Sequence, residues 1–165
     1  MQRLQVNSYT SPMDAAPLIA EVGRAMEAVG LEAVLIGNAA AALRGAPVTT
    51  VDLDFLFRRT PRNVQKLKQL AARLGATVLR PYYPVSDLFR IVRDDDGLQL
   101  DFMGSIHGIR SYEGLRDRGS TLEIGDAKIL VASLDDVIRS KRAAKRPRDL
   151  AVLGLLEKAR EEEGK

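Results

Sequence analysis

Residues 51–57 read Val-Asp-Leu-Asp-Phe-Leu-Phe, so that acidic side chains alternate with apolar ones. Successive side chains of a β-strand point to opposite faces of the sheet. A strand here presents Asp52 and Asp54 on one face, about 7 Å apart, and the apolar residues 51, 53, 55 and 57 on the other. Two carboxylates held this close repel each other unless a cation neutralises them. The pattern therefore predicts a divalent-metal site with oxygen ligands, which suits Mg²⁺ or Mn²⁺.

A glycine-containing junction precedes this strand. Leu35-Ile36-Gly37-Asn38-Ala39 lies where a short buried strand, residues 32–36, is expected to end and an alanine-rich helix, residues 38–43, to begin. The free backbone N–H groups and the helix dipole at such a junction favour anions, and Gly37 has no Cβ to keep a phosphate away. We expect a phosphate site at Gly37 and Asn38; a plain turn is the alternative.

The sequence also predicts a hairpin that carries a third acidic residue. Its arms are residues 88–93 and 98–103, and Asp94-Asp95-Asp96-Gly97 between them is typical of a turn and not of a metal loop. On the second arm, Asp101 shares a face with Gln99 and Met103. If this arm lies beside residues 51–57, Asp101 completes a three-carboxylate site. Two metals in such a site can hold the attacking and leaving oxygens of a phosphoryl transfer.

The other expected elements follow from caps, breakers and periodicity. They are a helix over 12–29, a helix over 61–74, a strand near 77–79, an irregular segment over 104–119, a strand near 128–131, a helix from Ser133 to Ala144 and a helix from Pro147. We predict an α+β fold with a mixed or antiparallel sheet flanked by helices. One domain spans residues 1–165, with about 1–11 flexible and about 133–163 forming a C-terminal helical part.

Composition excludes several classes of protein. No cysteine and a single histidine exclude disulfides, thiolate metal sites and the common multi-histidine zinc centres. No apolar run approaches a membrane span, and the N-terminus lacks a signal-peptide core, so we expect a cytoplasmic protein without a membrane partner. The net charge of +3 and the isoelectric point near 9.3 are compatible with NTP or RNA as a partner.

The order of strand, Gly37, short helix, Thr50-Val51-Asp52-Leu53-Asp54-Phe55-Leu56 and a later Asp101 resembles the DNA polymerase beta-type nucleotidyltransferase superfamily. Within it, the chain is most similar to small bacterial nucleotidyltransferases that include the abortive-infection toxins of toxin–antitoxin pairs. The resemblance covers roughly residues 31–156. The segment 133–150, with Lys141 and Asp149, is similar to the ending of those proteins.

The resemblance implies a metal-dependent transfer of NMP from an NTP to a hydroxyl of an acceptor. It favours tRNA, other RNA or a protein over an antibiotic as the acceptor, and a cognate antitoxin is an implied partner. Asp52 and Asp54 would bind Mg²⁺, and Asp101 would bind metal and help to deprotonate the acceptor.

The same resemblance assigns the nucleotide site. Gly37 and Asn38 would hold the triphosphate, Lys141 would contact phosphate, and Asp149 would support Lys141 or the basic cluster around it. The chain departs from the usual pattern at two positions: Asn38 stands where a second Gly or Ser is common, and Val48 stands where an Arg is common. Asn still caps a helix, whereas Val48 removes a positive charge near the site.

Alternatives remain open at this stage. The basic run 141–148 suits either phosphate binding or the end of one helix and the start of the next. His107 is expected to be an ordinary loop residue. Tyr82-Tyr83 is compatible either with stacking on a nucleotide base or with lining an edge of the fold. A non-catalytic nucleotidyltransferase-like module that binds nucleotide or a partner protein is the second hypothesis, which Val48 favours and the three aspartates oppose. An unrelated α+β domain is the third.

Overall fold

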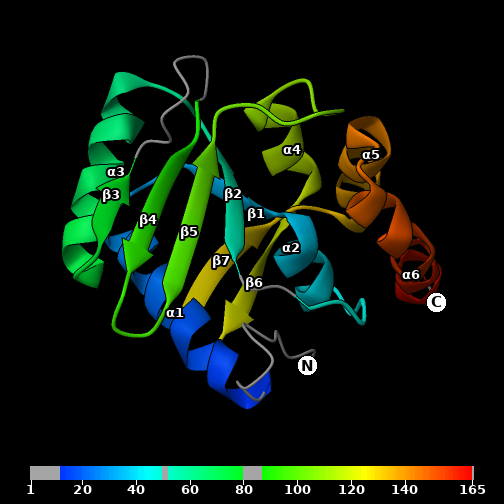
Figure 1. Ribbon diagram of the computed structural model, residues 1–165, viewed down its shortest axis with the longest axis horizontal. Helices are drawn as coiled ribbons and strands as arrows, with labels where there is room; N and C mark the ends of the chain where they lie inside the picture. The colour runs from blue at the N-terminus through cyan, green and yellow to red at the C-terminus, as the bar shows by residue number, and fades with distance from the viewer. Residues whose placement is uncertain (1–11, 50–51, 80–86, 165) are drawn as a thin grey trace.

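The computed structural model describes residues 12–49, 52–79 and 87–164, with side chains from residue 16 onward (Figure 1). Its helices are α1 (Pro12–Val29), α2 (Gly37–Leu43), α3 (Pro61–Leu74), α4 (Tyr112–Arg118), α5 (Leu134–Ala144) and α6 (Pro147–Glu163). Its strands are β1 (Ala33–Ile36), β2 (Leu53–Phe57), β3 (Thr77–Leu79), β4 (Phe89–Arg93), β5 (Leu98–Met103), β6 (Ser120–Ile124) and β7 (Ala127–Val131). The predicted segments 1–11 and Tyr82-Tyr83 lie outside the described residues.

All strands join one seven-stranded sheet in the order β3-β4-β5-β2-β1-β7-β6. β2 pairs in parallel with β5, and β1 pairs in parallel with β7, whereas the other neighbours are antiparallel. The sheet is therefore mixed, and the predicted α+β fold class is confirmed. The hairpin is also confirmed, with Gly97 at φ 72° in its turn.

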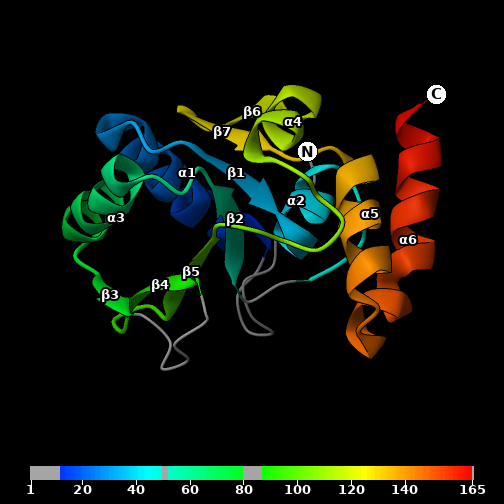
Figure 2. The ribbon, with the colours of Figure 1, turned by 90° about the horizontal axis from the view of Figure 1, so that it is seen from above.

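The helices gather in two groups. α1 packs against α3 and lies on β7 and β6, while α2 contacts β1, β2 and α5. Figure 2 shows α5 and α6 side by side at the opposite end of the molecule from α3. Within the described ranges, no helix has both the length and the apolar character needed to cross a membrane.

The apolar faces predicted for β2 and β5 meet in the core. Phe55 and Phe102 stack with ring centroids 4.9 Å apart, and Phe57 meets Phe102 edge-on at 6.3 Å. All three side chains are fully buried. Stacked and edge-on aromatic pairs add to the stability that burial provides, so these rings fix β2 against β5.

Two elements differ from the sequence prediction. Residues 112–118 form α4, although the segment 104–119 was expected to be irregular. Ser111 caps this helix by accepting a hydrogen bond from Gly114 N, but only Leu115 is buried, and seven residues are too few to show a helical period. The sequence prediction also missed β6, which pairs with β7 across a turn at Gly125, φ 62°.

Asn63 ties the start of α3 to the sheet. Its side chain is almost fully buried, donates to Glu32 Oε2 at 3.0 Å and to the Arg58 carbonyl at 2.9 Å, and accepts from Glu32 N at 3.3 Å. Thr60 caps the same helix through Asn63 N, as the sequence predicts. A buried amide that makes three hydrogen bonds leaves polar groups unsatisfied when it is removed.

We therefore expect Asn63→Ala to lower the free energy of unfolding by about 2–4 kcal/mol. Urea unfolding measures the change. Gln69→Ala, at an exposed position of the same helix, is the matched control and should change stability by less than about 0.5 kcal/mol. Equal effects of the two substitutions would contradict the assigned role of Asn63.

Candidate active site

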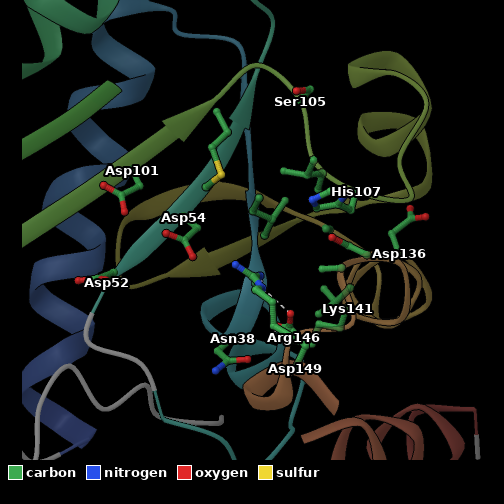
Figure 3. Close-up of a pocket in the computed structure, with 18 of the residues that line it drawn as sticks. Asn38, Asp52, Asp54, Asp101, Ser105, His107, Asp136, Lys141, Arg146 and Asp149 are labelled. Atoms are coloured by element: carbon green, nitrogen blue, oxygen red, sulfur yellow. Dashed lines mark hydrogen bonds and ion pairs between the residues drawn. The ribbon is translucent and has the colours of Figure 1, made fainter. Parts of the chain in front are cut away.

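The pairing of β2 with β5 brings the three predicted acidic residues together. In the parallel register Asp54 lies directly beside Asp101, and Asp52 immediately precedes β2. Asp101 is 7% exposed, which is unusual for a carboxylate on a sheet. Figure 3 shows the three side chains along one wall of a pocket. The expectation that Asp101 lies beside the Asp52–Asp54 segment is therefore met by the strand order.

The carboxylates perturb one another. Burial, followed by the charges of Asp101 and Asp52, raises the pKa of Asp54 to about 6, and the more distant Lys141 and Arg146 oppose this rise. Burial and the charge of Asp101 also raise the pKa of Asp52. Neighbouring carboxylates with raised pKa values in a cleft are typical of a functional site.

Arg90, which the sequence interpretation did not single out, compensates Asp101. It stands opposite Asp101 in the β4–β5 register, and its Nε and Nη2 donate to the two carboxylate oxygens at 2.8 and 3.3 Å. The hydrogen bond to Asp101 raises the pKa of Arg90. The hairpin turn at 94–97 fixes which residues of the two arms face each other. The pairing of Arg90 with Asp101 could therefore have been predicted from the position of this turn in the sequence.

The acidic wall, formed by Asp52, Asp54 and Asp101, is partly suited to bind a divalent cation. Asp52 and Asp54 supply the hard oxygen ligands that Mg²⁺ prefers, and a cation would relieve the repulsion that raises the pKa of Asp54. Across the described residues, however, no three acidic or histidine side chains converge closely enough to hold a metal. Asp101 is turned to Arg90 instead.

Gly37 and Asn38 border the acidic wall. Gly37 has a φ of 68°, and a Cβ at this position would lie 3.2 Å from Asp54 Oδ2, so both backbone conformation and space favour glycine. Asn38 Nδ2 contacts the Thr49 carbonyl at 3.5 Å. Its Oδ1 is buried and has no hydrogen-bond partner among the described residues. A buried acceptor without a partner in a pocket is normally satisfied by a hydrogen-bond donor from a ligand or from water.

A basic wall faces the acidic one. Lys141 Nζ lies 3.4 Å from Asp149 Oδ1, and Arg146 Nε lies 2.5 Å from Asp149 Oδ2. Asp149 is 1% exposed, and burial lowers the pKa of Lys141 despite the nearby carboxylate. The basic run 141–148 spans the end of α5 and the start of α6, as one of the two alternatives expects, and three of its basic residues also line the pocket. Phosphate binding by this run stays a prediction.

Between the two walls lies a cavity of about 600 Å³. A cavity of this size accommodates a small-molecule ligand. Arg148 also lines it, and no acidic partner for Arg148 is found within the described ranges. Val48 packs against the core and does not line the cavity.

Two further cavity residues have roles that the sequence interpretation did not assign. His107, expected to be an ordinary loop residue, lines the cavity. Asp136, in the first turn of α5, is 1% exposed and pairs with Arg118 and Arg139, each at 2.8 Å. Its ion pair with Arg118 joins α5 to α4, a contact that local sequence patterns do not reveal.

Sequence comparison identifies the family. Residues 16–165 match the family described as "Nucleotidyl transferase of unknown function (DUF2204)", and the chain belongs to this family. No curated protein matches the chain in sequence. The resemblance to the nucleotidyltransferase superfamily is therefore confirmed.

Solved structures share the fold. A lincomycin-bound lincosamide antibiotic adenylyltransferase, LnuA, has a TM-score of 0.59 at 18% identity, over 87% of this chain and 96% of that chain. ANT(2'')-Ia in complex with adenylyl-2''-tobramycin has a TM-score of 0.57 at 18% identity, over 90% and 96%. A putative nucleotidyltransferase from Thermotoga maritima has a TM-score of 0.56 at 17% identity, over 90% and 92%. These likenesses confirm the nucleotidyltransferase fold.

The raised pKa of Asp54 predicts an effect on stability. The folded pKa of about 6 lies above the ordinary value of 3.8, so the stabilisation from protonating Asp54 is complete below pH 3.8 and is lost as the pH rises through 6. In metal-free protein at pH 7.5, Asp54→Asn should therefore raise the free energy of unfolding by up to about 3 kcal/mol. This gain should disappear below about pH 4.

Urea unfolding in the presence of a chelator, at both pH values, measures this difference. Asp95→Asn, in the exposed hairpin turn, is the matched control and should change stability little at either pH. A less stable Asp54→Asn protein at pH 7.5 would contradict the repulsion inferred for the acidic wall.

Proposed function

We propose that this member of the nucleotidyltransferase family is an active, metal-dependent enzyme that moves NMP from an NTP to an acceptor hydroxyl. The observation that carries the proposal is the cavity with Asp52, Asp54 and Asp101 on one wall and Lys141, Arg146 and Arg148 on the other. Such a cavity is suited to a triphosphate with its cations. In-line attack by the acceptor oxygen on the α-phosphorus forms the new ester bond, and the bond to pyrophosphate breaks.

The acidic residues would hold the metal and the acceptor. Asp52 and Asp54 would be the Mg²⁺ or Mn²⁺ ligands, with Asp101 as the third, and Asp101 would also take the proton of the acceptor hydroxyl. A bound divalent cation would neutralise charge that develops on the phosphate oxygens. The raised pKa of Asp54 supports this assignment, because a bound cation would stabilise the ionised form that burial and the neighbouring carboxylates disfavour.

The remaining cavity residues would hold the nucleotide. The Oδ1 of Asn38, a buried acceptor without a partner among the described residues, supports a hydrogen-bond donor of the nucleotide at this border, beside Gly37. Asp149 orients Lys141 through its ion pair, so that Lys141 can contact phosphate. Arg148, with no acidic partner in the described part of the chain, is suited to the charge of the leaving pyrophosphate.

The acceptor is proposed to be RNA or protein. Arg142, Lys145 and Arg146 of α5 and the α5–α6 turn are exposed, and Arg146 also lines the cavity. Their charges suit a polyanion such as tRNA. Because the chain resembles toxin nucleotidyltransferases, we propose that this modification is toxic and that a cognate antitoxin is the partner. A cytoplasmic location is proposed as well, since NTPs are available there.

A second candidate is a non-catalytic nucleotide-binding or partner-binding module. The ion pair between Arg90 and Asp101 favours it, because Asp101 is then engaged by a protein group. Val48, which stands where an Arg is common in the superfamily, favours it as well, because a positive charge near the site is missing. Turnover distinguishes the two candidates, since a binding module would retain nucleotide without transferring it.

We expect purified protein with Mg²⁺ and α-labelled NTPs to label a macromolecule in total RNA or cell extract. Asp52→Asn and Asp54→Asn should lower labelling by at least about 10³-fold, because the metal ligands act on the reacting phosphate. Asp95→Asn should label like the wild type. Tobramycin and lincomycin, the compounds in the two adenylyltransferase structures, are tested as small-molecule acceptors in the same assay.

Labelling of RNA or protein supports the proposed acceptor class, and labelling of an antibiotic alone would contradict it. No labelling with any NTP, despite nucleotide binding, would instead favour the non-catalytic module.

Arg148→Gln should weaken binding of a non-hydrolysable NTP by about tenfold, with little effect on NMP, because charge-assisted hydrogen bonds to the terminal phosphates are lost. Isothermal titration calorimetry measures both dissociation constants. Arg62→Gln, an exposed position in α3, is the control and should leave both unchanged. Equal losses for NTP and NMP would contradict a role at the terminal phosphates.

A further inference from the structure

Arg90 occupies the position of a cation beside the acidic wall. Its guanidinium engages both oxygens of Asp101, and Gln99 Nε2 adds a contact to Oδ2 at 3.4 Å. Asp52 and Asp54 also contribute to raising its pKa, after the effects of Asp101. A carboxylate has about four lone-pair positions, so these donors leave Asp101 little capacity for a further ligand.

Burial explains why Asp101 needs this partner. At 7% exposure, an ionised carboxylate without a counter-charge would be strongly unfavourable. Asp54 is compensated differently, by the charges of Lys141 and Arg146 across the cavity. In the acidic wall, Asp101 is thus neutralised directly by a cation of the protein.

We propose that Arg90 is a built-in counter-ion that competes with the divalent cation for Asp101 and must leave before Asp101 can bind metal. This inference rests on the proposed metal-dependent function. The Arg90 side chain is 38% exposed and lines the cavity, so it has room to move without leaving the site. Once released, its guanidinium is available to a phosphate oxygen of the nucleotide.

The consequence is an order of binding. Without nucleotide, a cation meets Asp52 and Asp54 but not Asp101, so metal alone binds weakly. A phosphate that attracts Arg90 frees Asp101, and the third ligand then strengthens metal binding. Arg90 is a positioning residue in this scheme, because it acts on the metal through Asp101.

A double-mutant cycle with Mn²⁺ alone tests the competition. Free Mn²⁺ is measured by electron paramagnetic resonance for the wild type, Arg90→Gln, Asp101→Asn and the double variant, without nucleotide. We expect Asp101→Asn to change the wild-type affinity by less than about twofold, Arg90→Gln to raise it at least about fivefold, and Asp101→Asn to abolish that gain.

Equal effects of Asp101→Asn in both backgrounds, or no gain from Arg90→Gln, would overturn the inference while leaving the metal site intact. Absence of Mn²⁺ binding in every variant would overturn the inference and the proposed metal-dependent function together. Circular dichroism and thermal melts check that each variant folds.

A measurement on the wild type does not depend on the variants folding well. The Nε–H resonance of Arg90, assigned by its loss in Arg90→Lys, reports the 2.8 Å hydrogen bond to Asp101. Saturating Mg²⁺ with a non-hydrolysable NTP should move it toward the position of a free arginine side chain. An unchanged resonance at saturation would overturn the proposed release.

Discussion

Parallel pairing of β2 with β5 brings Asp54 beside Asp101, although the two residues are far apart in the sequence. The opposite faces of the same strands hold Phe55 and Phe102, stacked at 4.9 Å. A slip of one residue would turn the ring of Phe102 toward the cavity and Asp101 into the core, so the register is strongly specified. Burial of apolar side chains thus determines the geometry of the acidic site. The carboxylates are brought together by this packing and not by their own interactions.

The cost of the arrangement is electrostatic. Burial, together with the like charges along one wall, raises the pKa of Asp54 to about 6, and the protein offsets these charges from two sides. Arg90 pairs with Asp101 from the neighbouring strand, while Lys141 and Arg146 act on Asp54 from the helices. Functional sites commonly trade stability for such a charge arrangement. The offset here is incomplete, because the pKa of Asp54 stays raised despite these cations.

Much of the fold and part of the site could be predicted from the sequence, because period-two alternation assigns the faces of β2 and β5 and strong caps mark α3 and α5. The Arg90–Asp101 pair could also have been found, since the hairpin turn at Asp94–Gly97 fixes which residues face each other. The short α4 could not, because tertiary packing and not periodicity stabilises a helix of seven residues. The cavity between the acidic and basic walls depends on how the helices pack against the sheet, which local sequence patterns do not encode.

The separation of the two walls depends on α2. Its residues 39–42 are all alanine and at most 1% exposed, and α2 contacts both the sheet and α5. Small side chains allow helices to approach closely. α5 then turns at Lys145, whose φ of 57° is positive, and Pro147 begins α6 with Asp149 buried beneath Lys141 and Arg146. The alanines of α2 therefore set how far the basic residues stand from the aspartates, and the triphosphate proposed to bind between them would require that distance to be short.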